Sequence, residues 1–169
     1  LDSGCGTGVS TSGLAVRYPH ASVVGVDQSA DRLGRSGRAV DGLIAVADHA
    51  VLVRADLVDL WRLMWADGVR PRQHLLWYPN PWPKPVHLMR RWHAHPVMPT
   101  LLALGGELEL RSNWRVYIDE FAQALAVYGL SSVIEEVTIL PPVTPFERKY
   151  RDSGHPLWRL SAHLTECAA

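Results

Sequence analysis

The stretch "LDSGCGTG" (1–8), followed by "ASVVGVD" (21–27), decides the fold. Its three glycines alternate with other residues, and this spacing lets a backbone turn tightly and approach a ligand closely. A helix-like segment follows the glycines, and the N-terminal end of a helix favours a negatively charged group. The next segment is rich in β-branched residues and ends on Asp27. This strand, loop, helix and strand predict a ligand-binding α/β unit.

The rest of the chain continues the alternation of strand-like and helix-like segments. Such alternation predicts a Rossmann-like α/β fold with a mostly parallel sheet and helices on both faces. The last two strands follow one another directly, so they predict an antiparallel hairpin at the edge. We expect seven strands, of which the first is cut short, at residues 1–3, 21–27, 50–56, 74–78, 106–112, 131–140 and 157–164.

The length and the composition set limits on the class of protein. The 169 residues, 47% of them hydrophobic, predict a single domain over 1–169. The chain begins at Leu1 without Met and with almost no strand before the glycines, so we expect that an N-terminal extension is missing. Two cysteines make no disulfide framework and no apolar run would span a membrane, so we expect a cytoplasmic protein with no membrane contact.

The charge and the histidines add two further expectations. The 17 basic residues balance 17 acidic ones, which argues against a wholly basic surface but leaves room for a local basic face. His87, His93 and His95 resemble a metal cluster only in spacing, because no cysteine lies nearby and no pair stands four residues apart on a helix. We therefore expect no metal. We also expect a monomer or a weak homodimer.

Two classes of cofactor loop compete for the glycines. A dinucleotide loop needs G-x-G-x-x-G, and Val9 occupies the last glycine position of that pattern. The pattern D-x-G-x-G-x-G is complete. It resembles motif I of the class I S-adenosylmethionine-dependent methyltransferases. The resemblance implies that the loop wraps S-adenosyl-L-methionine, that the leading acid faces the ammonium group, and that the cofactor contacts include Asp2, Gly4, Gly6 and Gly8.

Two further acids end strands in register with this loop. Asp27 follows Gly8 by 19 residues, where a carboxylate accepts hydrogen bonds from both ribose hydroxyls. Asp56 ends the third strand, and the resemblance places such an acid beside the adenine amino group. Each acid on its own is equally well explained as the N-cap of a helix. Together they strengthen the assignment of a cofactor site, because ligands bind at the carboxyl ends of parallel strands.

The next strand ends in "YPNPWPK" (78–84), a proline-rich segment that excludes a helix or a central strand. It resembles the P-D-P-W-x-K motif of the bacterial tRNA (guanine-N7)-methyltransferases. Further segments resemble the motifs of that family in the same order: "KPVHLMRRW" (84–92), "LALGGELELRSNWRVYIDEF" (102–121) and "TPFERKYRDSGHPLWRL" (144–160).

The resemblance implies a substrate and the residues that contact it. The substrate is guanine N7 in tRNA, Asn80 is the candidate catalytic residue, and basic side chains near the same loops contact phosphates. Asn80 and Asn113 stand where the family has aspartates, and an amide lacks the charge of a carboxylate. The implied substrate contacts are Lys84, Arg90, Arg91, Asn113, Thr144 and Glu147, with Arg111 among the further candidates for phosphate contact.

Three readings of this site remain open. The first is guanine-N7 methylation of tRNA or a related RNA. The second is methylation of another nitrogen in a small molecule or protein, since amino-methyltransferases carry [D/N]-P-P-[F/Y/W] at this strand end and "NPW" fits that pattern in part. The third is a relative that binds RNA or cofactor without catalysis. Thr144 and Glu147 also fit a helix capping box.

Overall fold

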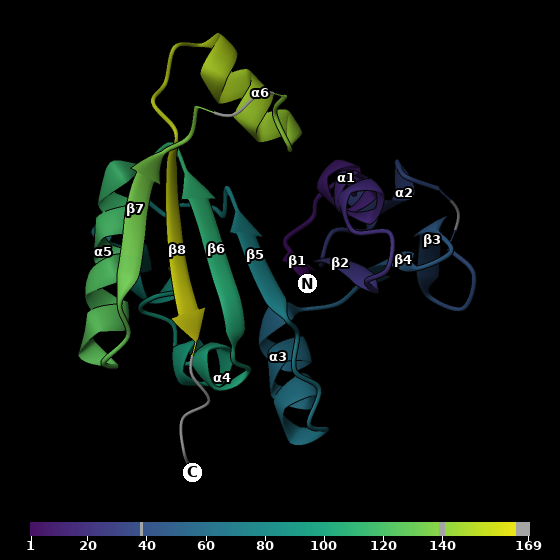
Figure 1. Cartoon of the computed structure of the whole chain (residues 1–169), viewed down its shortest axis with the longest axis horizontal. Helices are drawn as coiled ribbons and strands as arrows, with labels where there is room; N and C mark the ends of the chain where they lie inside the picture. The colour runs from purple at the N-terminus through teal and green to yellow at the C-terminus, as the bar shows by residue number, and fades with distance from the viewer. Residues whose placement is uncertain (38, 139–140, 165–169) are drawn as a thin grey trace.

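A single sheet of eight strands runs through the computed structural model, which describes residues 1–37, 39–138 and 141–164. The strand order is β3-β4-β2-β1-β5-β6-β8-β7 (Figure 1). The strands are β1 (Asp2–Ser3), β2 (Val23–Asp27), β3 (Leu43–Ala47), β4 (Ala50–Arg54), β5 (Gln73–Trp77), β6 (Gly106–Ser112), β7 (Ser132–Glu136) and β8 (Trp158–Leu164).

Six α-helices and one 3-10 helix connect these strands in the described ranges. They are α1 (Val9–Arg17), α2 (Ala30–Gly34), α3 (Leu57–Ala66), η1 (Pro85–Arg90), α4 (Met98–Ala103), α5 (Arg115–Val127) and α6 (Pro145–Asp152). None of the described helices is long and apolar enough to cross a membrane.

The mostly parallel α/β fold is confirmed, and the strand count is corrected. The predicted seven strands become eight, because β3 pairs antiparallel with β4. It lies between the helix-like stretch predicted to end at about residue 40 and the strand predicted at 50–56, where we expected no strand. The predicted antiparallel pairing of the last two strands at the edge is confirmed, with α6 inserted between them in the chain. β8 lies between β6 and β7 and is antiparallel to both, so β7 forms the edge of the sheet. Residues 139–140 of the predicted strand 131–140 lie outside the described part of the chain.

Alternate side chains of β5 define the two faces of the sheet, since successive residues of a strand point to opposite sides. Leu76 belongs to the largest apolar cluster, with Trp61 of α3, Leu101 of α4 and Phe121 of α5. Leu75 and Trp77 instead belong to the cluster that contains Leu14 and Ala15 of α1. Helices therefore lie on both sides of the sheet, with α3, α4 and α5 on one side and α1 on the other.

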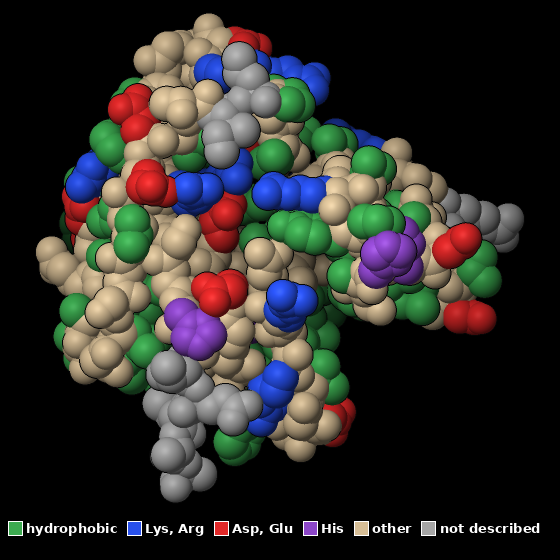
Figure 2. Space-filling view, in the orientation of Figure 1, with side chains coloured by type: hydrophobic (Ala, Val, Ile, Leu, Met, Phe, Trp, Pro, Cys, Tyr) green, Lys and Arg blue, Asp and Glu red, His purple; other side chains and the backbone are tan. Residues whose placement is uncertain are grey.

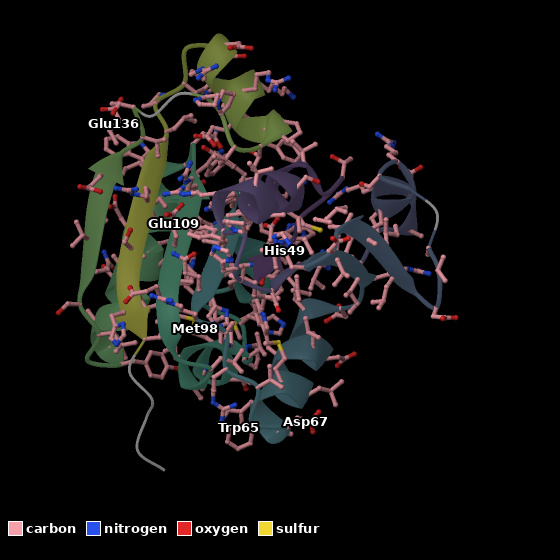
Figure 3. The ribbon with its side chains drawn as sticks, turned by 45° about the vertical axis from the view of Figure 1, so that its right-hand side comes forward. His49, Trp65, Asp67, Met98, Glu109 and Glu136 are labelled. Carbon is pink, nitrogen blue, oxygen red and sulfur yellow. The ribbon has the colours of Figure 1, made fainter. Side chains whose placement is uncertain are left out.

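The face of β6, β8 and β7 on the α1 side carries polar side chains. In Figure 1 the described helices leave this face uncovered, and in Figure 2 acidic, basic and histidine side chains are interspersed over it. His163 of β8 contacts Glu107 of β6 at 2.7 Å, and Arg159 pairs with Glu135 of β7. Glu109 of β6, labelled in Figure 3, lies on the same face. Charges of both signs alternate here, so this face is no basic patch.

Candidate active site

The carboxyl ends of β1, β2, β4 and β5 meet at one edge of the sheet and surround two adjoining cavities. The larger has a volume of about 700 Å³ and the smaller about 280 Å³. Gly4, Ser29, Arg32, Trp77 and Phe146 line both cavities, so the two form one continuous site. The predicted site residues that line at least one of them are Asp2, Gly4, Gly6, Asp27, Asp56, Asn80, Arg90 and Thr144.

The glycine loop turns directly under the smaller cavity. Gly4, Gly6 and Gly8 have φ angles of 86°, 61° and 71°, all in the left-handed region. A Cβ atom at Gly8 would lie 2.5 Å from Leu52 Cδ1, so only glycine fits there without displacing the core. Cβ atoms at Gly4 and Gly6 would meet nothing within 4 Å, because these residues border the cavity. The loop thus presents bare backbone to a ligand.

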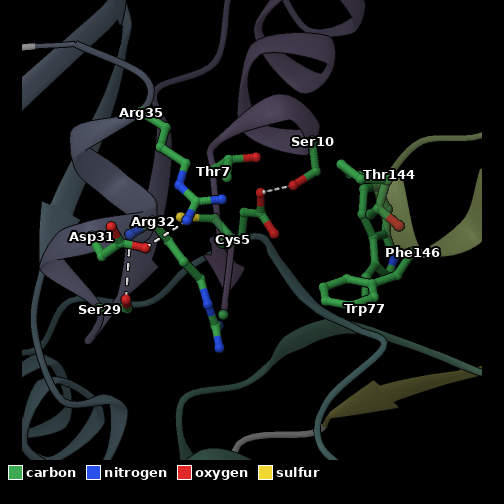
Figure 4. Close-up of a pocket in the computed structure, with 14 residues that line it drawn as sticks. Cys5, Thr7, Ser10, Ser29, Asp31, Arg32, Arg35, Trp77, Thr144 and Phe146 are labelled. Carbon is green, nitrogen blue, oxygen red and sulfur yellow. Dashed lines mark hydrogen bonds and ion pairs between the residues drawn. The ribbon is translucent and has the colours of Figure 1, made fainter.

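Asp2 lies at the floor of the smaller cavity and is almost completely buried. Its Oδ2 accepts hydrogen bonds from Ser10 Oγ at 2.6 Å and Thr11 Oγ1 at 2.7 Å. Figure 4 shows the first of these bonds. Burial raises the pKa of the carboxyl, and the two hydroxyl donors oppose that rise. A cation placed beside Asp2 would favour its charged form.

Asp27 connects the glycine loop to the segment after β2. Its Oδ2 accepts the Gly6 N–H at 3.0 Å and its Oδ1 accepts the Ser29 N–H at 2.8 Å. Arg32 Nη1 lies 3.4 Å from Oδ2. Each carboxylate oxygen has two lone pairs, so Asp27 retains capacity to accept further hydrogen bonds from a ligand.

Asp56 is exposed and stands at the N-terminus of α3, where its Oδ1 accepts the Val58 N–H at 2.8 Å. It also lines the larger cavity. Asp56 is therefore both the N-cap of α3 and a residue of the larger cavity. The bond to Val58 uses one carboxylate oxygen and leaves the second unused by the backbone of α3.

The proline-rich segment after β5 forms a stiff loop along the larger cavity. Tyr78 and Trp82 have φ angles of 55° and 44°, which residues other than glycine rarely adopt. Asn80 lies between them, is exposed, and accepts the Trp82 N–H with its Oδ1 at 3.1 Å. The Arg90 guanidinium carbon lies 4.8 Å from the centre of the Trp82 ring, a cation–π contact.

Arg91 holds this loop from below. Its Nε and Nη2 donate to the Trp82 carbonyl oxygen at 3.2 and 3.1 Å, and its Nη1 pairs with Glu120 of α5. Arg91 is a predicted substrate contact, but its guanidinium is buried, donates to these protein groups and lines neither cavity, so the structure gives no support to that role. His93 Nε2 lies 3.2 Å from the same Glu120 carboxylate, and burial lowers the His93 pKa.

A buried ion pair attaches α6 to the sheet. Thr144 caps α6 by accepting the Glu147 N–H at 3.0 Å, and Glu147 accepts Arg111 Nη1 at 3.1 Å. Arg111 Nε also donates to Glu109 at 2.7 Å, as does Trp77 Nε1 at 2.8 Å. Arg111 is therefore buried and paired, which corrects its prediction as a phosphate contact. In Figure 4 Thr144, Phe146 and Trp77 face the glycine loop across the cavity.

The remaining predicted substrate residues lie apart from the cavities. Lys84 is exposed at the start of η1, and Asn113 is half-buried beyond the end of β6, and neither lines a cavity. Glu147 contacts the site through Thr144 and Arg111 and does not border it. No group of three His, Cys, Asp or Glu side chains in the described ranges is arranged to hold a metal ion.

Several aromatic residues of the site were missed by the sequence reasoning. Tyr78, Phe146 and Tyr150 line the larger cavity, and the rings of Phe146 and Tyr150 stack with centres 6.3 Å apart on α6. Trp92 and His95 border it from the segment after η1. The i, i+4 spacing of Phe146 and Tyr150 places them on one helix face, which was the available signal.

A mostly parallel sheet, a glycine loop after its first strand and an acid at the end of the second define a class I methyltransferase fold. The sequence comparisons agree. Residues 1–160 match the family described as "Putative methyltransferase", and the chain belongs to this family.

Curated relatives of the chain are tRNA (guanine-N(7)-)-methyltransferases. The protein of Leifsonia xyli is 30% identical, with 95% of this chain and 73% of that protein covered. The protein of Treponema pallidum subsp. pallidum is 29% identical, with 95% of this chain covered. The chain spans 64% of the length of that relative.

Solved structures with the same fold include two 16S rRNA methyltransferases. A 16S rRNA (adenine(1408)-N(1))-methyltransferase from Catenulisporales acidiphilia superposes with a TM-score of 0.65 at 18% identity, covering 99% of this chain and 86% of that one. The 16S rRNA methyltransferase KamB superposes with a TM-score of 0.63 at 16% identity, covering 98% and 86%. At these identities the likeness establishes the fold.

Proposed function

We propose that this protein is an S-adenosyl-L-methionine-dependent methyltransferase that methylates guanine N7 in tRNA. The observation that carries the proposal is the joint position of the glycine loop and the loop of Asn80. They border one continuous site at the carboxyl ends of β1 and β5, which are neighbouring parallel strands. The relatives named above have this activity, and we propose that it acts in the cytoplasm as a monomer or weak homodimer.

The residues present fit S-adenosyl-L-methionine. The open backbone of Gly4 and Gly6 borders the smaller cavity, and the buried carboxyl of Asp2 offers a partner for an ammonium group. Asp27 retains lone pairs for ribose hydroxyls, and Asp56 stands where an adenine amino group would reach it. When bound, the cofactor supplies an electrophilic methyl group on a sulfonium, and its transfer breaks one C–S bond and forms one C–N bond.

The protein has no proton to remove in this reaction, because guanine N7 carries a lone pair and no hydrogen. Its residues instead position the base and exclude water. Trp82, Trp92 and Tyr150 provide flat apolar walls on which a base would stack. Arg90, held on the Trp82 ring, supplies a positive charge for an RNA phosphate.

The reading as a methyltransferase of another nitrogen is less well supported. In that reading the asparagine oxygen accepts from the amino group of the substrate. The Asn80 oxygen accepts the Trp82 N–H at 3.1 Å and keeps one lone pair for such an amino group, so the reading is weaker only because the curated relatives are named for guanine N7.

Mass spectrometry of tRNA incubated with the purified protein and S-adenosyl-L-methionine tests the proposal. We expect new 7-methylguanosine at one position of the tRNA. Calorimetry with the cofactor alone tests cofactor binding separately from methylation of RNA. Cofactor binding without 7-methylguanosine in any tRNA would refute the RNA substrate, and no cofactor binding by the chain would refute the methyltransferase activity.

A further inference from the structure

The Asn80 side-chain amide is fixed in one orientation by its own loop. Its Oδ1 lies 3.1 Å from the Trp82 backbone nitrogen. A backbone N–H can only donate, so only the amide oxygen can face it, and the NH2 group must point elsewhere. Asn80 lines the larger cavity, and the described residues supply no hydrogen-bond partner for its NH2 group.

Rotation of this amide is opposed by the surrounding contacts. The reversed amide would place two donors, its NH2 group and the Trp82 N–H, against each other. Trp82 cannot turn its N–H away easily, because Arg91 holds its carbonyl oxygen through two hydrogen bonds at 3.2 and 3.1 Å. The carboxylates that line the cavity, Asp27 and Asp56, belong to the loops after β2 and β4. The loop that carries Asn80 contributes no carboxylate to the cavity, and the group that it presents there is the uncharged NH2 donor of Asn80.

We propose that Asn80 donates to the O6 atom of the target base and so selects purines that carry a 6-oxo group. The proposal rests on the proposed function and specifies how its substrate is recognised. Guanine presents N7 and O6 side by side, and both are acceptors, whereas adenine presents N7 beside an amino donor. A donor at O6 holds N7 close to the reacting position. An adenine at the same place would oppose its amino group to the Asn80 NH2 group.

This contact differs from the one that a carboxylate would make at the same position. A carboxylate only accepts, so it would repel O6 and pair with the N1–H and N2–H groups of guanine. A carboxylate at this position would contact the amino group on C2 of guanine, whereas Asn80 contacts the oxygen on C6. Hypoxanthine, which keeps O6 and lacks the C2 amino group, should then be a substrate as good as guanine.

The test uses a tRNA in which the methylated guanosine is replaced by inosine or by 2-aminopurine. Inosine lacks the C2 amino group and keeps O6, and 2-aminopurine keeps the amino group and lacks O6. We expect the kcat/KM for inosine to lie within about threefold of guanosine, and that for 2-aminopurine to fall at least tenfold. Dimethyl sulfate reactivity of the same RNAs corrects for the intrinsic nucleophilicity of each N7.

The matched variant is Asn80→Asp, which keeps an oxygen acceptor for the Trp82 N–H and replaces the NH2 donor by a charged acceptor. We expect it to raise the guanosine-to-inosine ratio of kcat/KM at least tenfold. A wild-type protein that methylates guanosine but discriminates at least tenfold against inosine would overturn the assignment of O6, while leaving the proposed function intact. Absence of methylation in the guanosine tRNA would instead refute the proposed function, and this inference with it.

Discussion

Arg91 donates two hydrogen bonds to the carbonyl oxygen of Trp82, and Glu120 of α5 holds the other end of its guanidinium. A helix on one side of the sheet thereby fixes the loop that borders the substrate side of the cavity. Arg91 acts through Trp82 and does not reach the cavity itself, so it is a positioning residue.

The Arg91→Lys variant keeps the charge and loses the planar fork that reaches both partners. We expect kcat to fall about tenfold, while the Kd for S-adenosyl-L-methionine changes less than about threefold, because the glycine loop is untouched. Single-turnover kinetics and calorimetry measure the two quantities. Arg159→Lys, whose partly exposed pair with Glu135 lines neither cavity, is the control and should leave both unchanged. Equal losses in cofactor binding and kcat would contradict the positioning role.

Replacement of Gly8 by alanine should damage the cofactor loop. The new Cβ would lie 2.5 Å from Leu52 Cδ1 on a backbone with φ 71°. We expect the free energy of unfolding to fall by about 2–4 kcal/mol, measured in urea, with weaker cofactor binding. Gly13→Ala in α1 meets nothing within 4 Å and should instead stabilise by about 0.5–1 kcal/mol. Similar effects at the two positions would argue against the packing explanation.

Neutralising Glu147 should detach α6 from the sheet. Glu147→Gln removes one of the two carboxylates that compensate the buried guanidinium of Arg111 and leaves Glu109 as the other, so we expect a loss of about 2–4 kcal/mol in unfolding free energy. Protease cleavage within α6 should also become faster. The matched control is Glu135→Gln, whose partner Arg159 is partly exposed, and it should cost less than about 1 kcal/mol. Unchanged protection of α6 would mean that the ion pair does not hold it.

The free energy of unfolding should depend on pH because of His74 of β5. This side chain is completely buried, and neither ring nitrogen has a hydrogen-bond partner in the described residues. Burial lowers its pKa from 6.5 to about 3. Between these values the unfolded chain binds the proton and the folded chain does not, so stability falls as the pH drops below 6.5, by up to about 1.4 kcal/mol per unit.

The His74→Leu variant should flatten this dependence. Thermal unfolding between pH 7 and pH 4 measures it, with the wild-type chain as the reference. An equally steep loss of Tm in the variant would assign the acid sensitivity to other groups.

Binding of tRNA should depend on salt partly through Arg90. We expect Arg90→Gln to reduce the slope of log K against log salt by about one, since one phosphate contact is lost. Filter binding at several salt concentrations measures the slope. The exposed Arg62 of α3, which lines neither cavity, is the control. An unchanged slope in Arg90→Gln would remove Arg90 from the RNA surface.

The local sequence patterns predicted the strands around the site better than they predicted which strands pair with each other. The predicted segments at β2, β4, β5 and β6 agree with the structure within a few residues, because short apolar or alternating runs are local signals. The strand β3 was missed, since its five residues follow a region read as helical. The position of β8 between β6 and β7 depends on pairing between distant segments, which periodicity does not encode.

The same limit applies to side chains. Arg90 and Arg91 are neighbours of one type in a basic segment, yet one faces the cavity and the other is buried. The two arginines differ because Arg91 pairs with Glu120, which lies 29 residues further along the chain. Asn80 lines the larger cavity and its catalytic role stays a prediction, while the bond from its oxygen to Trp82 follows from loop geometry alone.

The place of β8 also governs when the described sheet is completed during synthesis. Until residues 158–164 have left the ribosome, β6 has an open edge and β7 has no strand beside it in the described sheet. The nascent chain therefore exposes unpaired backbone on two strands, a state that chaperones recognise and that aggregates readily. A translation product that stops short of β8 would lack the strand that follows α6, and quality control would have an open sheet edge by which to detect it.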